Sequence, residues 1–354
     1  AMHDILPADP GRPLLHRRLN ENAARLRQYY AQLTAAAREE SQVTPAAVWF
    51  VDNFHIVDAQ IRSVRRDLPP GYYRQLPKLA NGELRGLPRV FALAWAEVAH
   101  TDSRFERDML LRFCQAYQKI KPLQIGETWA LSISLRIVLI ENLRRLCAGL
   151  VQRRDLRRRA DAIADALPAV ESASAVPALK DLGAAPLPPA LAAQLFQRLR
   201  DAGAMALPLL SWLHQRLAAQ GTTAEELVHQ EHQRQSAINV SVRNVITSLK
   251  LLADMDWPKF VESISRTDEL LRQHSDFGRM DFATRDQYRH AIESLARSSS
   301  LSELQVTRRV LAEARTRRCD PGELLLGRER RTLERLLAAR VPSGERIDRL
   351  LGRL

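Results

Sequence analysis

The chain is dominated by one stretch, residues 125–159, which reads IGETWALSISLRIVLIENLRRLCAGLVQRRDLRRR. Its first half is apolar on nearly every side of a helix, and its second half is rich in arginine. The longest apolar part runs from Trp129 to Ile140 and contains Arg136. A membrane-spanning helix needs roughly 20 apolar residues, so this part is too short and predicts a helix buried in protein. We expect one helix from residue 126 to about residue 166.

The composition of the 354 residues favours the same secondary structure. Hydrophobic residues make up 45% and charged residues 27%, which is typical of a globular protein rather than a disordered one. Aromatic residues are few, at 6%, whereas alanine, leucine and arginine, which lose little freedom in a helix, are abundant. Alternating β-branched runs and Asn-Gly or Asp-Gly turns are nearly absent. The sequence therefore predicts an all-α fold.

A second helix is predicted after residue 44. Thr44 is a suitable N-cap, and Pro45 fits the first helical position because the N–H that it lacks would be unpaired there in any case. Apolar residues then recur at three- and four-residue spacing, namely Ala47, Phe50, Phe54, Val57, Ile61 and Val64. The Pro-Pro-Gly sequence at 69–71 ends the helix. The loop expected after it carries Tyr72, Tyr73 and Arg74.

Three further helices show similar signals. One runs from about residue 105 to 120, with Thr101, Asp102 and Ser103 available as caps. Another runs from about Thr223 to Asp254. Its second half carries a heptad seam for packing on another helix, made of Ile238, Val242, Val245, Leu249 and Leu252. The third follows a capping box of Ser300 and Glu303 and extends through Arg315.

Between residues 168 and 190 the character of the sequence changes. Five prolines alternate there with alanines and serines, which indicates a linker between domains. No repeat of fixed period is present, so a regular solenoid is not expected. We therefore predict an irregular multi-helix bundle with two helical subdomains, residues 1–167 and 191–354, joined by a Pro/Ala-rich linker at 168–190.

The formal charge of +12 points to acidic partners. A field of that sign suits an anionic membrane surface, a phosphate-bearing ligand or a nucleic acid, and it does not choose among them. Three scattered cysteines, Cys114, Cys147 and Cys319, argue for a reducing compartment. No signal peptide opens the chain and no segment is long enough to cross a bilayer, so we expect a cytoplasmic location.

The arginines late in the long helix are candidates for contact with anionic lipid: Arg153, Arg154, Arg157, Arg158 and Arg159. Each such contact contributes about 1 kcal/mol near a charged membrane. The alternative is that their aliphatic stems cover apolar surface on a neighbouring helix. Nucleic acid is the less favoured partner, because no aromatic residues for base stacking are interleaved with these charges.

Three charged residues lie in the apolar half of the long helix, where we expect a buried ion-pair network: Glu127, Arg136 and Glu141. Arg136 in particular needs a carboxylate partner, because an unpaired buried charge is very costly. The sequence alone does not identify that partner.

The sequence predicts no metal site and no catalytic residue. Glu226 with His229 and His232 is the nearest metal pattern, but a di-iron bundle needs two such motifs and further carboxylates. Asp254 and Asp256 form a DxD pattern at a helix end, where capping or exposure is the better interpretation because no strand precedes them. A phosphate-binding glycine loop, a nucleophile elbow and an HExxH helix are all missing.

Six strings, taken together, carry a resemblance. They are LPPGYYRQLPKL (68–79), AWAEVAHTDSRF (94–105), IGETWAL (125–131), RIVLIENLRR (136–145), VSVRNVITSL (240–249) and RMDFATRDQYRH (279–290). In combination they are similar to the N-terminal region of the cyclic β-1,2-glucan synthases, which are very large bacterial inner-membrane proteins. The resemblance covers residues 44 to 320.

The resemblance implies a pathway. In these synthases a cytoplasmic helical region precedes the first membrane helices, and a glycosyltransferase domain that uses UDP-glucose and a divalent metal follows them. The chain lacks that domain's QxxRW pattern, since no tryptophan in it follows an arginine. The resemblance therefore implies no catalytic residue and no cofactor in this chain and a place at the inner face of the bacterial inner membrane. The implied partners are the transferase and membrane domains of the same polypeptide.

The polar residues of the matching strings are the candidates for contact with those partners: Tyr72, Tyr73, Arg74, Asp102, Arg104, Arg279, Asp281, Arg285 and Tyr288. Our first hypothesis is a non-catalytic helical scaffold or interaction module that supports glucan synthesis by a transferase domain elsewhere. One alternative is that the chain itself binds nucleotide sugar or glucan, with Glu97, Asp102, Asp254 and Asp256 as the carboxylates of interest. The other is a basic nucleic-acid-binding protein, whose affinity for any duplex would depend strongly on salt.

Overall fold

The structure is a computed structural model that describes residues 5–6, 14–39, 43–166, 182 and 186–337. Helices account for most of the described chain, which confirms the predicted all-α class. The strands in this part of the chain are two residues long: Ile5–Leu6 (β1) pairs antiparallel with Lys78–Leu79 (β2).

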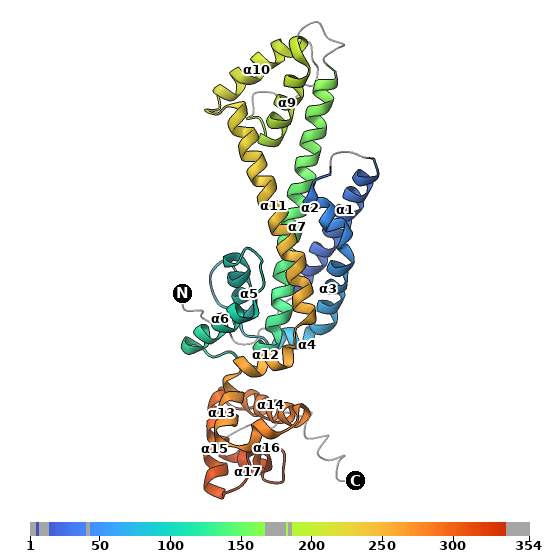
Figure 1. Cartoon of the computed structure of the whole chain (residues 1–354). Coiled ribbons are helices and arrows are strands. Elements are labelled where there is room, and N and C mark those ends of the chain that lie inside the picture. Colours follow the sequence, from blue (N-terminus) through green and yellow to red (C-terminus); the bar gives the residue numbers. More distant parts are fainter. Residues whose placement is uncertain (1–4, 7–13, 40–42, 167–181, 183–185, 338–354) are drawn as a thin grey trace.

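Two long helices form the axis of the molecule (Figure 1). The helices α7 (Ile125–Asp165) and α11 (Ala224–Asp254) pack side by side and run in opposite directions. The 41 residues of α7 rise about 60 Å at 1.5 Å per residue. At the start of α11, Thr223 and Glu226 form a reciprocal capping box that satisfies two otherwise unpaired groups. No described helix is both long enough and apolar enough to span a bilayer.

The body of the molecule surrounds the first half of α7 and the second half of α11. It is completed by α1 (Leu14–Arg38), α2 (Pro45–Asp52), α3 (Phe54–Asp67), α4 (Pro70–Gln75), α5 (Arg89–His100) and α6 (Arg107–Ile120). Helices α1, α3 and α5 pack on α7, and α2 and α3 also contact α11. The predicted seam of α11 is confirmed, because Val242, Val245, Leu249 and Leu252 are fully buried in this core.

A helical cap covers the far ends of both long helices, at the top of Figure 1. It consists of α9 (Pro189–Asp201), the 3-10 turn η3 (Gly203–Ala206) and α10 (Leu207–Ala218). Its leucines form a second core with Ala160 and Ile163 of α7. Most of the predicted linker, residues 168–190, lies outside the described residues, so the boundary between the two predicted subdomains stays a prediction. The described helices on its two sides share a core, because α11 returns along α7.

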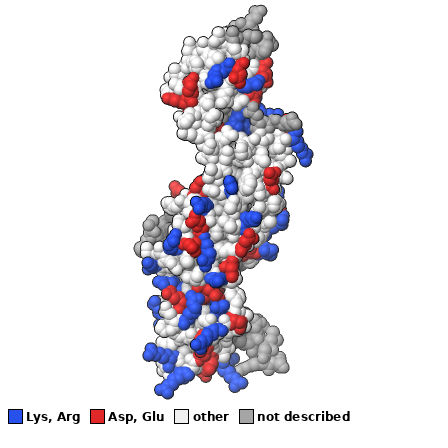
Figure 2. Space-filling view, in the orientation of Figure 1, with Lys and Arg blue, Asp and Glu red and all other residues white. Residues whose placement is uncertain are grey.

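After α12 (Trp257–Ile264) the chain forms a C-terminal lobe, residues 266–337, at the lower end of Figure 1. The lobe consists of α13 (Arg266–His274), η4 (Asp276–Arg279), α14 (Phe282–Arg297), α15 (Glu303–Arg317), α16 (Pro321–Leu325) and α17 (Arg330–Leu336). Its core includes Phe277 and Ile292 and takes in Ile125 from the start of α7. In Figure 2, acidic and basic side chains alternate along the body, and basic side chains are prominent over the lobe.

The region after Thr44 differs in two details from the prediction. Thr44 caps α2 as predicted, but Asn53 interrupts the helix, and its side-chain amide donates to the carbonyl of Trp49, 2.8 Å away. This bond competes with the helical backbone. The residues 72–74, predicted as a loop, lie in the short helix α4, because Pro70 provides a suitable first helical residue.

Two predicted caps are also wrong. Asp102 and Ser103 do not cap α6, which begins further along the chain; they form a turn with left-handed φ angles of 46° and 62°. The capping box predicted at Ser300 forms two residues later, from Ser302 and Gln305. The reason lies in the tertiary structure, because the Glu303 side chain bonds to the start of α7 instead of the start of its own helix.

Candidate functional site

A groove of about 760 Å³ lies where the C-terminal lobe meets the body. We call it the junction groove. On the body side it is lined by α4 and the first turns of α7, and on the lobe side by α14, with Trp257 of α12 between them. In Figure 1 it lies at the level where α4, α12 and α14 come together. A mainly apolar groove with a few converging polar groups is the usual form of a ligand site.

Aromatic side chains provide much of the apolar wall of the junction groove. Trp129 of α7 and Phe282 of α14 meet edge to face, with ring centroids 6.3 Å apart, and Phe282 is 39% exposed. Tyr72 of α4 donates its hydroxyl to the carbonyl of Gly126, 2.6 Å away, which fixes the ring against the start of α7. Burial raises the pKa of Tyr72 well above its ordinary value, so this hydroxyl stays protonated.

Arg136 contributes a charge to the body side of the groove. Its guanidinium lies 3.4 Å from the carboxylate of Asp67 and 3.4 Å from the carbonyl of Leu252. Burial lowers the pKa of Arg136, and the nearby Asp67 carboxylate opposes that change. Its Nε is buried and has no hydrogen-bond partner in the described part of the chain.

Arg289 contributes a charge to the lobe side. It is only 1% exposed, and its Nη2 donates to Asp268 over 2.6 Å and to Glu262 over 2.7 Å. Burial by itself lowers the pKa of Arg289, but the two carboxylates more than offset this and hold it above its ordinary value. The pairing ties α14 to α12 and α13, which fixes the lobe wall of the groove.

Glu303 links the lobe directly to the body. Its carboxylate accepts the backbone N–H of Ile125 over 2.7 Å, at the first residue of α7. This N–H has no partner within its own helix, so Glu303 supplies what a capping residue supplies elsewhere. Burial, together with the neighbouring Glu293 and Glu127, raises the pKa of Glu303 to about 8. The contact is therefore sensitive to pH near neutrality.

The other residues predicted at 72–74 have separate surroundings. Tyr73 is fully buried; the Lys78 ammonium lies 5.1 Å from its ring centroid, and His16 meets it edge to face. Arg74 is exposed and donates to the carbonyl of Pro70, 3.3 Å away, within its own short helix. Of these three predicted residues, only Tyr72 lines the junction groove.

The turn at Asp102, in the segment between α5 and α6, is hydrogen-bonded to both long helices. The Ser241 hydroxyl of α11 donates to the Asp102 carboxylate over 3.0 Å. The Asn142 amide of α7 donates to the Ser103 hydroxyl over 2.6 Å, and the Ser248 hydroxyl of α11 donates to the Ser103 carbonyl over 2.7 Å. These bonds hold two non-glycine residues in a left-handed conformation that is otherwise unfavourable. The neighbouring predicted residue, Arg104, is exposed and pairs with Glu106 over 2.8 Å.

The residues predicted in the lobe are mostly engaged within it. Asp281 caps α14 by accepting the Thr284 N–H over 2.9 Å, and this bond lowers the pKa of Asp281. Tyr288 is buried and donates its hydroxyl to Asp320. The remaining two form ion pairs: Arg285 with Glu262 at 3.1 Å, and Arg279, which is largely exposed, with Asp276 at 3.3 Å.

The three charges predicted as one buried network are buried, but they have three different partners. Glu127 pairs with Arg89 of α5, with exposed fractions of 0% and 1%. Glu141 accepts from Arg18 of α1 over 2.6 Å. Arg136 pairs with the aspartate that ends α3. Each pair therefore attaches a different helix to α7.

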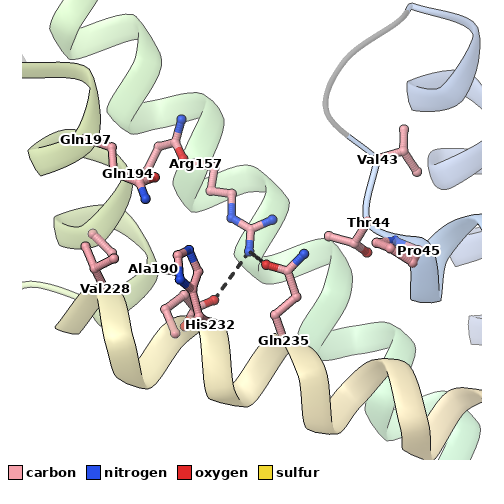
Figure 3. Close-up of a pocket in the computed structure, with 12 residues that line it drawn as sticks. Val43, Thr44, Pro45, Arg157, Ala190, Gln194, Gln197, Val228, His232 and Gln235 are labelled. Atoms are coloured by element: carbon pink, nitrogen blue, oxygen red, sulfur yellow. Dashed lines mark hydrogen bonds and ion pairs between the residues drawn. The ribbon is translucent and has the colours of Figure 1, made fainter. Parts of the chain in front are cut away.

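The arginine run of α7 faces neighbouring helices at several positions. Arg153 and Arg157 both lie near the Glu231 carboxylate of α11, at 3.2 and 3.5 Å. Figure 3 shows Arg157 pointing into a polar pocket of about 220 Å³ between α7, α9 and α11. Arg158 lies 3.7 Å from Glu39 of the α1 end, and Arg154 donates to the carbonyl of Gln32 over 3.4 Å. Arg159 is exposed.

The carboxylates suspected of metal or sugar binding have local structural roles. Asp256 caps α12 by accepting the Lys259 N–H over 3.0 Å, and Asp254 is the last residue of α11. Glu97 is mostly buried in α5, and burial raises its pKa. In the metal-like pattern, Glu226 is part of the capping box of α11.

Several groove residues were not singled out as site residues by the sequence. Trp129 and Phe282 lie inside the strings that resemble the synthase family, so the sequence could have identified them as site candidates. Arg289 lies beside Tyr288 in the same string, and its burial was not visible without the fold. For Glu303 the sequence gives a misleading signal, because it resembles an ordinary helix-start glutamate.

Comparison with known proteins places the chain in a family context. No family model matches it. Over 331 residues it is 37% identical to the cyclic beta-(1,2)-glucan synthase NdvB of Rhizobium meliloti (strain 1021). The match covers 90% of this chain and 12% of that protein, so the chain corresponds to a small part of its relative. The chain is therefore a relative of one segment of the cyclic beta-(1,2)-glucan synthase family.

Proposed function

We propose that the chain is a non-catalytic helical scaffold within a cyclic beta-(1,2)-glucan synthase. The observation that carries this proposal is how the polar residues of the matching strings are used. Asp102, Glu127 and Tyr288 each bond to a residue on another helix or turn, and those contacts join segments far apart in the sequence. Residues engaged in this way stabilise an arrangement of helices and leave little side-chain chemistry for a reaction.

In this proposal, the scaffold lies at the inner face of the bacterial inner membrane. It supports a transferase domain, outside this chain, that takes glucose from UDP-glucose with the help of a divalent metal. Its partners are the transferase and membrane domains of the same polypeptide. The net charge of +12 supports this placement, since positive residues are enriched on the cytoplasmic side of membrane proteins.

The test is a full synthase that carries changes in this region. Replacing Arg89 with Met and Glu127 with Leu removes a buried ion pair and keeps its volume, an exchange that proteins often tolerate. The scaffold role predicts that a correctly folded double variant still forms cyclic glucan. It also predicts no heat of binding when the chain is titrated with UDP-glucose and Mg²⁺. Loss of glucan formation in the folded variant, or a saturable titration, would contradict the proposal.

A second candidate function is glucan binding in the junction groove. The aromatic faces of Tyr72, Trp129 and Phe282 favour it, because sugar rings pack on aromatic faces while nearby charged groups bond to hydroxyls. Calorimetric titration with a linear β-1,2-linked glucose oligosaccharide tests it. The expected result is saturable binding that Phe282→Ala abolishes and that Trp49→Ala, an exposed aromatic outside the groove, leaves unchanged. Absence of binding to the unmodified chain rules this function out.

A further inference from the structure

A second groove, of about 780 Å³, lies on the outer side of the C-terminal lobe. It runs between α13 and α15, and we call it the α15 groove. Its basic lining residues are Arg308, Arg315 and Arg318, with His274 opposite them on α13. Arg308 and Arg315 are seven residues apart, which places them on one face of α15, two turns from each other.

The three arginines of the α15 groove have no acidic partner among the residues that the structure describes. None of them takes part in an ion pair or a side-chain hydrogen bond with another residue that the structure describes, and all three are exposed. Their neighbour Arg317 is different, since it pairs with Glu313 over 2.6 Å and with Glu329 over 2.8 Å. The α15 groove therefore holds guanidinium groups whose donors are not used by the described part of the chain and can meet an external anion.

The acidic residues of the groove lining do not neutralise these charges. Asp276 lines the groove but pairs with Arg279, 3.3 Å away. Asp320 accepts the hydroxyl of Tyr288 and the N–H of Gly322, over 2.7 Å in the second case. The lining thus holds three guanidinium groups against two carboxylates, which leaves the groove with a net positive charge.

The α15 groove also has an apolar part. Its lining includes Leu270 of α13, Leu311 of α15 and Pro321 of α16. Guanidinium groups bind phosphate in a two-pronged geometry, and apolar lining residues accommodate the hydrocarbon next to a phosphate. No phenylalanine, tyrosine or tryptophan lines this groove in the described part of the chain, so it lacks the large stacking surfaces on which bases bind.

The geometry points to the α15 groove as a binding site for the phosphate headgroup of an anionic phospholipid. The lobe, rather than the arginine run of α7, then meets the membrane surface. In α7, Arg153 and Arg157 face the Glu231 carboxylate and are partly buried, whereas the groove arginines are exposed and unpaired. In Figure 2 basic side chains are prominent at this end of the molecule. This inference adds a lipid-binding site to the scaffold role. The two can fail separately, because vesicle binding and glucan formation are measured in different experiments.

Co-sedimentation of the chain with vesicles tests the site. One set of vesicles contains equal parts of phosphatidylglycerol and phosphatidylcholine, and the other contains phosphatidylcholine alone. We expect binding to the first set only. In the triple variant Arg308→Gln, Arg315→Gln, Arg318→Gln, affinity should fall by about a hundredfold, since each arginine near an anionic surface contributes about fivefold.

A control variant of equal charge separates a site from a general effect of charge. Arg112→Gln, Arg200→Gln and Arg234→Gln remove three exposed arginines that also form no ion pair with the described residues but lie outside the lobe. This control should lose less than tenfold in affinity, and circular dichroism should show that both variants keep their helices. An equal loss in the two variants would overturn the proposal, because affinity would then follow net charge alone.

Two further measurements distinguish other sources of the anion. Soluble glycerol phosphate should compete with vesicles only weakly, because it lacks the hydrocarbon and the charged surface. If it binds the chain as tightly as the vesicles do, the groove is a site for a small phosphate and the lipid assignment is wrong. If a DNA duplex binds more tightly than the vesicles and depends on the same three arginines, the assignment is also wrong.

Discussion

Two regions of this molecule use arginine in opposite ways. In the body, arginines reach carboxylates on other helices: Arg89 of α5 pairs with Glu127 of α7, and Arg153 of α7 pairs with Glu231 of α11. On α15 of the lobe, Arg308 and Arg315 point outward and have no such partner among the described residues. Both regions look alike in the sequence, as helices rich in arginine. The difference shows that an arginine's role depends on which helix lies opposite it.

The physical reason is the high cost of burying a charge without a partner. Where α11 packs along α7, it supplies Glu231, and the arginines opposite can be partly buried. The outer face of α15 is not packed against a described helix that offers a free carboxylate, so its arginines stay in water. Four substitutions test whether a buried carboxylate partner is what separates the two kinds of arginine.

Arg89→Ala should have the largest effect. It leaves the Glu127 carboxylate buried without its cation, and removing one member of a buried pair costs about 3–5 kcal/mol. Urea unfolding followed by circular dichroism measures the loss. The matched control is Arg104→Ala, whose exposed pair with Glu106 contributes about 1 kcal/mol or less. Similar losses in the two variants would mean that burial does not separate the two kinds of arginine.

Glu231→Ala should have the next largest effect. It removes the carboxylate shared by Arg153 and Arg157, and we expect a loss of about 1–3 kcal/mol in the free energy of unfolding. The freed arginines should also increase binding to anionic vesicles, which would make α7 resemble α15. Glu225→Ala, an exposed position on the same helix, serves as the control for both measurements. Unchanged vesicle binding would show that pairing is not what keeps α7 from the membrane.

Glu303→Gln concerns the contact between the two regions. Because the folded-state pKa of Glu303 is raised from 4.5 to about 8, the folded state favours the protonated acid. Stability from this group is complete below about pH 4.5 and is lost as the pH rises through about 8. The variant cannot lose that proton, so at pH 9 it should be more stable than the unmodified chain by about 1–2 kcal/mol.

Thermal unfolding at a series of pH values checks this expectation. The unmodified chain should lose stability relative to the variant as the pH rises from 4.5 to about 8, because in that interval the unfolded chain ionises at Glu303 while the folded state keeps the proton. Parallel curves for the two proteins would show that the carboxyl group titrates at its ordinary pKa.

Arg318→Gly should have the smallest effect on the free energy of unfolding, and it should raise the stability. Arg318 ends α15 with a left-handed φ of 55°, a conformation that glycine adopts without steric cost. We expect a gain of about 0.5–1 kcal/mol in stability, together with weaker binding to anionic vesicles. Arg315→Gly, inside the helix, should lose about 1 kcal/mol while it weakens vesicle binding equally. If Arg318→Gly lowers the stability, then the Arg318 side chain stabilises the fold, as the paired arginines of the body do, and the contrast between the two regions fails.

The sequence by itself determined most of the secondary structure. Caps such as Thr44 and Thr223 act on the few residues next to them, and their effect can be seen without the fold. The buried half of α7 was equally accessible, because its residues are apolar on every side and must avoid water. In the same way, the spacing of Val242 and Leu249 identified a face that packs on another helix.

Only the tertiary structure decided which residues form the candidate site. Glu303 contacts Ile125, far away in the sequence, and Tyr72 bonds to Gly126. Asp102 keeps its left-handed turn because Ser241 holds it. Hydrogen bonds and ion pairs of this kind are short-ranged in space but join distant parts of the chain, so the local pattern around either residue cannot identify them. The sequence therefore determined the helices, and their packing determined which charges are paired, which are exposed, and where the grooves lie.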